Sequence, residues 1–123
     1  MRIQRFEEIK AWQEGRELVK IVYQIIRRND ELNRDLRFKS QLTSSSISIM
    51  SNIAEGFSRN SNKEFIRFLF ISKGSLAELQ SLLYVALDQK YITNEEFNDI
   101  FEKTEITAKL ISKFITYLRS YIQ

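Results

Sequence analysis

Apolar residues recur every three or four positions along four stretches of the chain, which is the pattern of amphipathic helices. The first stretch runs from about residue 8 to residue 28, and one face of it carries Trp12, Gly15, Val19, Val22, Tyr23 and Ile26. The second runs from about residue 39 to residue 55, and its apolar or small residues are Leu42, Ser46, Ile49, Met50 and Ile53. Residues 29–38 between them are rich in turn-forming Asn and Asp, so we predict the longest loop there.

Two further helices begin with capping signals. Ser61 and Glu64 have the spacing of a capping box, in which the hydroxyl accepts a bond from the Glu64 N–H and the carboxylate reaches back to the serine N–H. This third helix is predicted over residues 62–89. A second capping box, Thr93-Asn94-Glu95-Glu96, begins a fourth helix over residues 94–121. Because the link between them is short, we expect these two helices to be antiparallel neighbours.

These elements predict an all-α fold in one domain, residues 1–123, built as an antiparallel four-helix bundle. The chain has no proline and three glycines, too few turn residues for a β-rich fold of this size. Gly56 stands where a left-handed residue would end the second helix. The residues predicted to be buried are Trp12, Ile26, Ile49, Ile53, Phe65, Leu69, Leu76 and Leu83.

The last two helices carry more apolar surface than one core-facing stripe requires. On the fourth, one stripe consists of Ile106, Leu110, Phe114, Tyr117 and Tyr121, and a second beside it consists of Ile111, Ile115, Leu118 and Ile122. The third has a second line at Ile66, Phe70, Ala77 and Tyr84. Apolar strips of this size usually mark partner surfaces, although packing under a loop is the alternative. We therefore predict a homo-oligomer with these candidate contact residues: Ile66, Phe70, Tyr84, Ile111, Ile115 and Leu118.

Cysteine and histidine are both absent from the chain. Their absence removes thiol nucleophiles, imidazole bases and the usual zinc ligands, and no carboxylates are spaced like a magnesium site. We expect no catalytic residues, no metal and no cofactor. No apolar stretch is long enough to span a bilayer, and the N-terminal residues lack the apolar core of a signal peptide. A cytoplasmic location without a membrane partner is the expectation.

The chain is mildly basic, with 19 Lys and Arg against 16 Asp and Glu, a net charge of +3. Clusters of basic residues suit phosphate binding because each contact releases counterions. The candidate nucleic-acid contacts are Arg16, Lys20, Arg27, Arg28, Arg59, Lys63, Arg67, Lys109 and Lys113, with Arg119 beyond them. The alternative is a solvated charged surface with local ion pairs, such as Glu105 with Lys109.

The central part of the chain resembles a known family. Residues 52–59, Asn-Ile-Ala-Glu-Gly-Phe-Ser-Arg, and residues 61–69, Ser-Asn-Lys-Glu-Phe-Ile-Arg-Phe-Leu, are similar to the signature of the 23S rRNA intervening-sequence proteins. The signature residues are Asn52, Glu55, Gly56, Arg59, Ser61, Glu64 and Phe65. Glu55 and Arg59 are interpreted as bridging the turn between the second and third helices, with Asn52 satisfying backbone groups there. A binding surface at these residues is the alternative.

This resemblance implies an up-and-down four-helix bundle that assembles into a homopentameric ring. The family is similar to the accessory proteins of diversity-generating retroelements, which bind nucleic acid and a reverse transcriptase. The resemblance therefore implies a non-catalytic scaffold or adaptor that binds RNA or DNA electrostatically, and the alternative is a protein–protein interaction module. The family commonly carries two arginines where this chain has Thr43 and Ser44, so we expect weaker binding than in a typical basic relative.

Overall fold

The computed structural model describes residues 2–122, in which every regular element is a helix and no strand occurs. The elements are the 3-10 turn η1 (Phe6–Glu8), α1 (Lys10–Arg28), α2 (Asp30–Arg34), α3 (Leu36–Phe57), α4 (Asn62–Asp88) and α5 (Asn94–Arg119). The all-α prediction is confirmed. The two ends of the predicted domain, Met1 and Gln123, lie outside the described residues.

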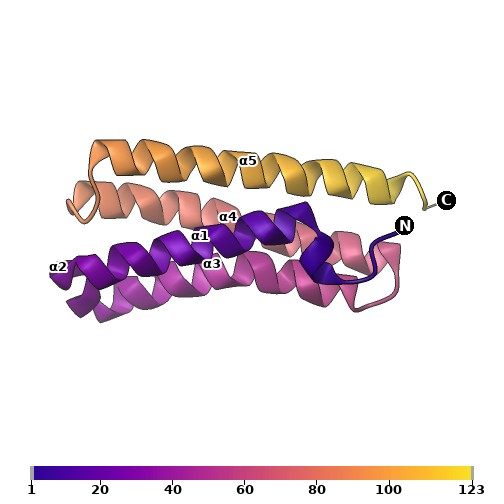
Figure 1. Ribbon diagram of the computed structural model, residues 1–123, viewed down its shortest axis with the longest axis horizontal. Coiled ribbons are helices and arrows are strands. Elements are labelled where there is room, and N and C mark those ends of the chain that lie inside the picture. The colour runs from indigo at the N-terminus through magenta and orange to yellow at the C-terminus, as the bar shows by residue number, and fades with distance from the viewer. Residues whose placement is uncertain (1, 123) are drawn as a thin grey trace.

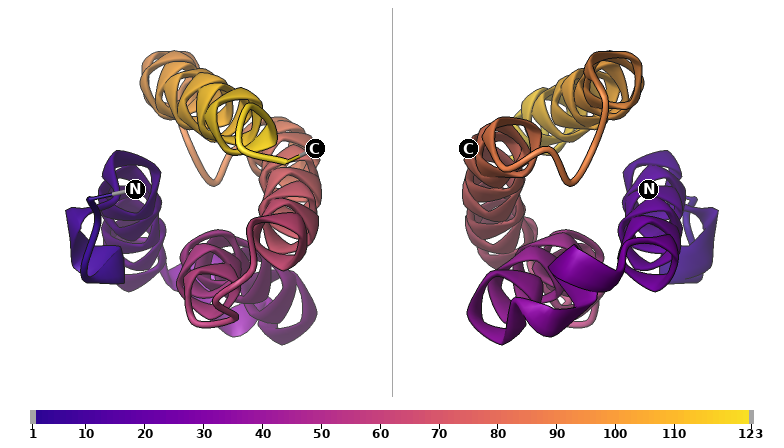
Figure 2. Two further views of the ribbon diagram at one scale, coloured as in Figure 1. Left: turned by 90° about the vertical axis from the view of Figure 1, so that its right-hand side faces the viewer. Right: turned by 90° about the vertical axis from the view of Figure 1, so that its left-hand side faces the viewer.

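The four long helices α1, α3, α4 and α5 run alternately up and down (Figure 1). Seen along the bundle, α1 packs beside α3 and α5, and α4 packs beside α3 and α5 on the opposite corner (Figure 2). The two chain termini and the turn at residues 58–61 lie together at one end, called here the terminal end. The turn at residues 89–93 and α2 lie at the other, called here the α2 end.

The core runs the length of the bundle and is built mainly from leucine and isoleucine. Its most deeply buried members include Leu18, Ile49, Ile53, Leu69, Leu76, Leu79, Leu83, Ile111 and Leu118. All the predicted core residues are buried except Trp12, for which the prediction is wrong. In α1 the inward line is Ala11, Leu18 and Ile25, so Trp12 lies beside the core and packs edge-on against Phe6 at 5.1 Å.

Helices α3 and α4 approach each other closely because small residues line their contact. A Cβ atom placed on Gly56 would lie 2.8 Å from both Phe65 Cδ1 and Phe68 Cβ. Gly56 is therefore required for close packing inside α3, and the prediction that it ends the helix in a left-handed conformation is wrong. The residue with positive φ in this turn is Asn60, at 56°. Serine hydroxyls cross the same contact, from Ser72 to the Ile49 carbonyl at 2.7 Å.

The loop predicted at residues 29–38 is mostly helical. The polar residues that suggested turns act instead as N-caps, because Asn29 accepts a bond from the Leu32 N–H at 3.0 Å and Asp35 accepts one from the Phe38 N–H at 3.3 Å. Leu32 is fully buried and anchors α2 to the bundle. The long loop was predicted because Asn and Asp favour turns and N-caps for the same reason, the short reach of their side-chain oxygens.

The two predicted capping boxes differ in the structure. The box at Thr93 is complete, with both reciprocal bonds to Glu96 formed at 2.9 and 3.1 Å. At Ser61 only one half forms: the hydroxyl accepts a bond from the Glu64 N–H at 3.3 Å, while the Glu64 carboxylate turns to Arg67. An arginine one turn further along the helix competes with the backbone N–H for that carboxylate.

Candidate functional site

The two apolar stripes of α5 lie in different environments. Ile111, Ile115 and Leu118 are at most 3% exposed within the chain's own core, so the prediction that they contact another subunit is wrong. Their line continues through Ile100, Thr104 and Thr107 along the whole helix, and this continuity makes it the inward face. The other stripe is exposed in part: Ile106, Tyr117 and Tyr121 are 44%, 42% and 59% exposed, whereas Leu110 and Phe114 are half-buried against the core.

The second line predicted on the third helix does lie on the surface. We call its surroundings the α4 outer face, and its residues are Phe70, Ile71, Gly74, Ala77, Ser81, Tyr84 and Val85, all exposed. Gly74 near its centre has no side chain, and a Cβ atom added there would meet nothing within 4 Å. Tyr84 leans over α5 and packs against Phe97 and Phe101, with ring centroids 4.8 and 5.8 Å away. Ile66 is half-buried at the same edge.

The seam between α1 and α5 is hollowed at both ends. Near the terminal end, a mostly apolar groove of about 550 Å³ is lined by Ile3, Ile9, Ala11, Leu110, Phe114 and Tyr117, with Arg2, Glu8 and Lys10 around it. Near the α2 end, a smaller groove of about 210 Å³ lies beside the ion pair of Arg28 with Glu96. Arg28, a candidate phosphate contact, therefore joins α1 to α5.

Positive charge is concentrated toward the terminal end. The half of the bundle nearer that end, residues 2–19, 48–76 and 107–122, contains eleven basic and six acidic residues. The half nearer the α2 end, residues 20–47 and 77–106, contains eight basic and ten acidic residues. The small net charge of the whole chain is thus the sum of a basic half and a slightly acidic half.

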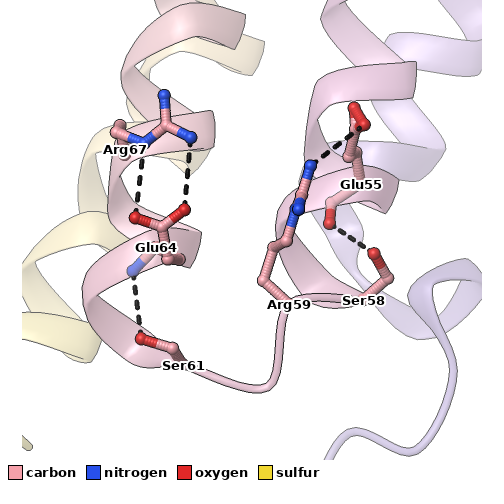
Figure 3. A network of polar contacts seen from close by, with 6 residues as sticks. All are labelled: Glu55, Ser58, Arg59, Ser61, Glu64 and Arg67. Atoms are coloured by element: carbon pink, nitrogen blue, oxygen red, sulfur yellow. Dashed lines mark hydrogen bonds and ion pairs between the residues drawn. The ribbon is translucent and has the colours of Figure 1, made fainter.

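Four of the family-signature residues, Glu55, Arg59, Ser61 and Glu64, make polar contacts around the turn between α3 and α4, together with Ser58 and Arg67 (Figure 3). Arg59 pairs with Glu55 at 3.6 Å, and Arg67 pairs with Glu64 at 3.2 Å. Both guanidinium groups also lie against the ring of Phe68, 4.9 and 4.8 Å from its centroid. Stacking and ion pairing together fix the directions of two positive groups on this surface.

Glu64 belongs to this network, whereas Asn52 lies outside it. The hydrogen bond from Arg67, together with the positive charge of that residue, lowers the pKa of Glu64. The predicted pair of Glu55 with Arg59 forms, but it stays at the end of α3 and does not bridge to α4. The prediction for Asn52 is wrong, since its side chain donates to the Ser48 carbonyl of its own helix at 2.8 Å.

The predicted basic clusters do not merge into one patch. Arg16, Lys20 and Arg27 are exposed on α1, whereas the cluster of Arg59, Lys63 and Arg67 lies at α4, diagonally across the bundle. Lys20 pairs with Glu17 at 3.0 Å. Lys109 and Lys113 are exposed on α5, and the expected pair of Glu105 with Lys109 is not among the ion pairs formed within residues 2–122.

One basic pair was missed from the sequence. Lys73 and Arg119 approach the ring of Phe70 from two helices, 5.8 and 5.5 Å from its centroid. Arg119 follows the candidate phosphate contacts Lys109 and Lys113 in the sequence, but no spacing rule connects it with Lys73 of α4. Only the packing of α5 on α4 brings these two charges together, at the edge of the α4 outer face.

Residues 2–122 contain neither a carboxylate metal site nor a membrane-spanning helix. No group of three or more Asp and Glu side chains is arranged there to hold a metal ion. Of the helices in this range, none combines the length and the apolar character needed to cross a membrane.

Comparison with known proteins gives one family and one fold. The sequence profile of the family described as 23S rRNA-intervening sequence protein matches residues 7–113. Among solved structures, the chain is similar to a protein of unknown function from the S23 ribosomal protein family of Bacteroides thetaiotaomicron VPI-5482, with a TM-score of 0.78 and 22% identity. That match covers 85% of this chain and 97% of the other, and it shows the shared fold. No curated protein matches the chain.

Proposed function

The chain belongs to the family of 23S rRNA-intervening sequence proteins, and from that premise we propose that it is a non-catalytic, self-associating scaffold that binds nucleic-acid phosphates at its terminal end. The observation that carries this proposal is the separation of charge along the bundle, with eleven basic and six acidic residues in the terminal half. A polyanion is attracted to such an end even though the net charge of the whole chain is only +3.

The turn between α3 and α4 supplies the best-ordered contacts for this role. Arg59 and Arg67 both pack against the ring of Phe68, and Lys63 lies exposed between them in sequence. Ordered guanidinium groups lose less side-chain entropy when they bind phosphate than mobile ones do. Because phosphates are the same along any strand, the binding is sequence-tolerant and applies to both RNA and DNA.

The α4 outer face supports self-association, because its large apolar side chains are exposed around Gly74. By resemblance to the family, the assembly is a ring of five subunits. A ring multiplies a weak phosphate-binding surface by the number of its copies, so that modest single contacts give useful overall affinity. A reverse transcriptase is a further partner by the same resemblance.

The basic side chains already engaged within the chain favour a second candidate function, a protein–protein interaction module. Lys20, Arg28, Arg59 and Arg67 each pair with a carboxylate of the same chain. If these pairs persist in solution, the charges solubilise the bundle and the apolar faces alone bind a partner.

The test is a titration of fluorescently labelled RNA and DNA at several salt concentrations. Arg59→Gln with Lys63→Gln removes two charges from the terminal end, and Arg34→Gln with Arg37→Gln removes two exposed charges from the α2 end as the matched control. We expect the first variant to reduce the slope of log affinity against log salt by about one unit per lost contact. The control should bind like the wild type.

Two results contradict the nucleic-acid proposal. The absence of wild-type binding at low salt favours the protein–protein module. If the two double variants reduce binding equally, binding depends on the total charge of the protein and is not localised at the terminal end.

A further inference from the structure

On the outward side of α5, the charges before Ile106 are mainly acidic and those after it are basic. Glu95, Asp99 and Glu102 precede Ile106, with Lys103 as the one basic residue among them, and Lys109 and Lys113 follow it, all of them exposed. None of these six charges takes part in the ion pairs formed within residues 2–122. Ile106 is 44% exposed and borders a hollow of about 320 Å³ whose other walls are Asp99, Glu102 and Lys103.

The attraction of charges to helix ends does not explain this arrangement. Acidic residues near the start and basic residues near the end of a helix favour its dipole, but that effect is confined to the first and last turns. In α5, which spans Asn94–Arg119, Glu102 and Lys109 lie in the middle of the helix. Their segregation calls for a different explanation.

We propose that this side of α5 pairs with the same side of α5 in a second copy of the chain, antiparallel, about a two-fold axis beside Ile106. A two-fold contact requires a surface that is complementary to itself. Antiparallel pairing places the acidic half of each helix against the basic half of the other. Parallel pairing places like charges together, so the charge pattern also specifies the orientation.

The spacing along the helix supports this register. Asp99 lies seven residues before Ile106 and Lys113 seven residues after it, so the two face each other across the axis. Glu102 lies four residues before Ile106, and Lys109 lies three residues after Ile106. In the paired helices, Glu102 of one copy therefore lies within about one residue of the level of Lys109 of the other copy. The two-fold axis repeats both contacts, and the two Ile106 side chains meet at the centre.

This contact is separate from the α4 outer face and goes beyond the proposed function. The two faces belong to different helices, so one copy can use both at once. The proposal also gives Lys109 and Lys113 a role other than phosphate binding, because their partners are carboxylates of the second copy.

The experiment uses two charge-reversed variants, each made with Phe70→Asp so that contacts of the α4 outer face do not mask the result. The acidic variant carries Lys109→Glu and Lys113→Glu, and the basic variant carries Asp99→Lys and Glu102→Lys. We expect Phe70→Asp alone to sediment as a dimer. Each charge-reversed variant should dissociate about tenfold or more readily, and an equimolar mixture of the two should regain the dimer. Glu78→Lys, a charge change on α4, is the matched control and should leave the dimer unchanged.

The salt dependence of dimer formation is a second test of the same contact. The dimer of Phe70→Asp should weaken as the Debye length falls from about 10 Å at 0.1 M salt to about 3 Å at 1 M. A mixture that sediments like its separate components overturns the proposal. So does an acidic variant that keeps the dimer but binds RNA more weakly, since that result assigns the two lysines to nucleic acid. Circular dichroism confirms that each variant is folded.

Discussion

Ser72 of α4 donates its hydroxyl hydrogen to the backbone carbonyl of Ile49 in α3, with the two oxygen atoms 2.7 Å apart. Both residues have no exposed surface. A serine side chain is short, so this bond forms only where the two helices are in close contact. It fixes the register of α3 against α4 at the middle of the bundle.

We expect Ser72→Ala to reduce the free energy of unfolding by about 0.5–1.5 kcal/mol, the usual net contribution of one hydrogen bond. Ser72→Leu should cost more, because a larger side chain must force apart two closely packed helices. Urea denaturation followed by circular dichroism measures both. Ser81→Ala on the exposed α4 outer face is the control, with a change within about 0.5 kcal/mol. If Ser72→Ala and Ser81→Ala are equally stable, the hydrogen bond from Ser72 to Ile49 does not contribute to the free energy of unfolding.

Replacing a glycine by alanine should change stability in opposite directions in α3 and in α4. Gly56→Ala places a Cβ 2.8 Å from two aromatic side chains, so we expect destabilisation of about 1–3 kcal/mol. Gly74→Ala meets no atom within 4 Å in a helix interior, so it should stabilise the monomer by about 0.5–1 kcal/mol. Thermal and urea denaturation of both variants would show the contrast, and a shift of the same sign in both contradicts this account of Gly56.

The α2 end should lose stability in alkali through Tyr91. Its hydroxyl donates to the Asp35 carboxylate at 2.8 Å, and this bond, with partial burial and the nearby negative charge, raises the pKa of Tyr91 above 10.0. A raised pKa means that the stabilisation is complete below the unfolded pKa of about 10 and is lost as the pH rises through the folded value. We therefore expect the stability difference between wild type and Tyr91→Phe to shrink above pH 10, measured by denaturation from pH 8 to pH 11. A difference that is constant over this range contradicts the assignment.

The α4 outer face should control assembly. Phe70 is 45% exposed in the single chain, and Phe70→Asp would remove a large apolar side chain from the proposed subunit contact and leave a carboxylate beside Lys73 and Arg119 in its place. Sedimentation should show smaller species while circular dichroism keeps the helical signal. Arg37→Gln, at an exposed position of α3 near the α2 end, is the control and should assemble normally. A wild-type protein that is monomeric at micromolar concentration contradicts the proposed contact.

The sequence predicted the existence and order of the four long helices because their apolar periodicity is strong and their caps are well marked. It could not predict which stripe of α5 faces inward. The stripe with Ile111 and the stripe with Tyr117 are both apolar, and the rotation of a helix about its axis is set by its neighbours. The continuation of the first stripe through Thr104 and Thr107 was hidden, because threonine reads as polar in a hydrophobic pattern although both are fully buried.

The candidate site was predictable in its residue types and only partly in its arrangement. The signature residues around Gly56 do gather at one turn, because they are close in sequence. The contacts of Phe70 with Lys73 and Arg119 depend on two helices packing together, so no spacing along the chain reveals them. Helix-capping Asn29 and Asp35 were mistaken for loop residues because caps and turns use the same short side chains.

The up-and-down order of the helices also bears on how the chain folds. The four long helices make four lateral contacts with one another. Three of these contacts join helices that follow one another in the chain: α1 with α3, α3 with α4, and α4 with α5. Only the contact of α1 with α5 joins helices that are far apart in the chain. Local contacts form with a small loss of loop entropy, so such a chain folds rapidly. We expect the contact between α1 and α5, which is hollowed at both ends, to form last during folding. Substitutions in that contact should therefore mainly raise the unfolding rate, whereas substitutions between α3 and α4 should lower the folding rate.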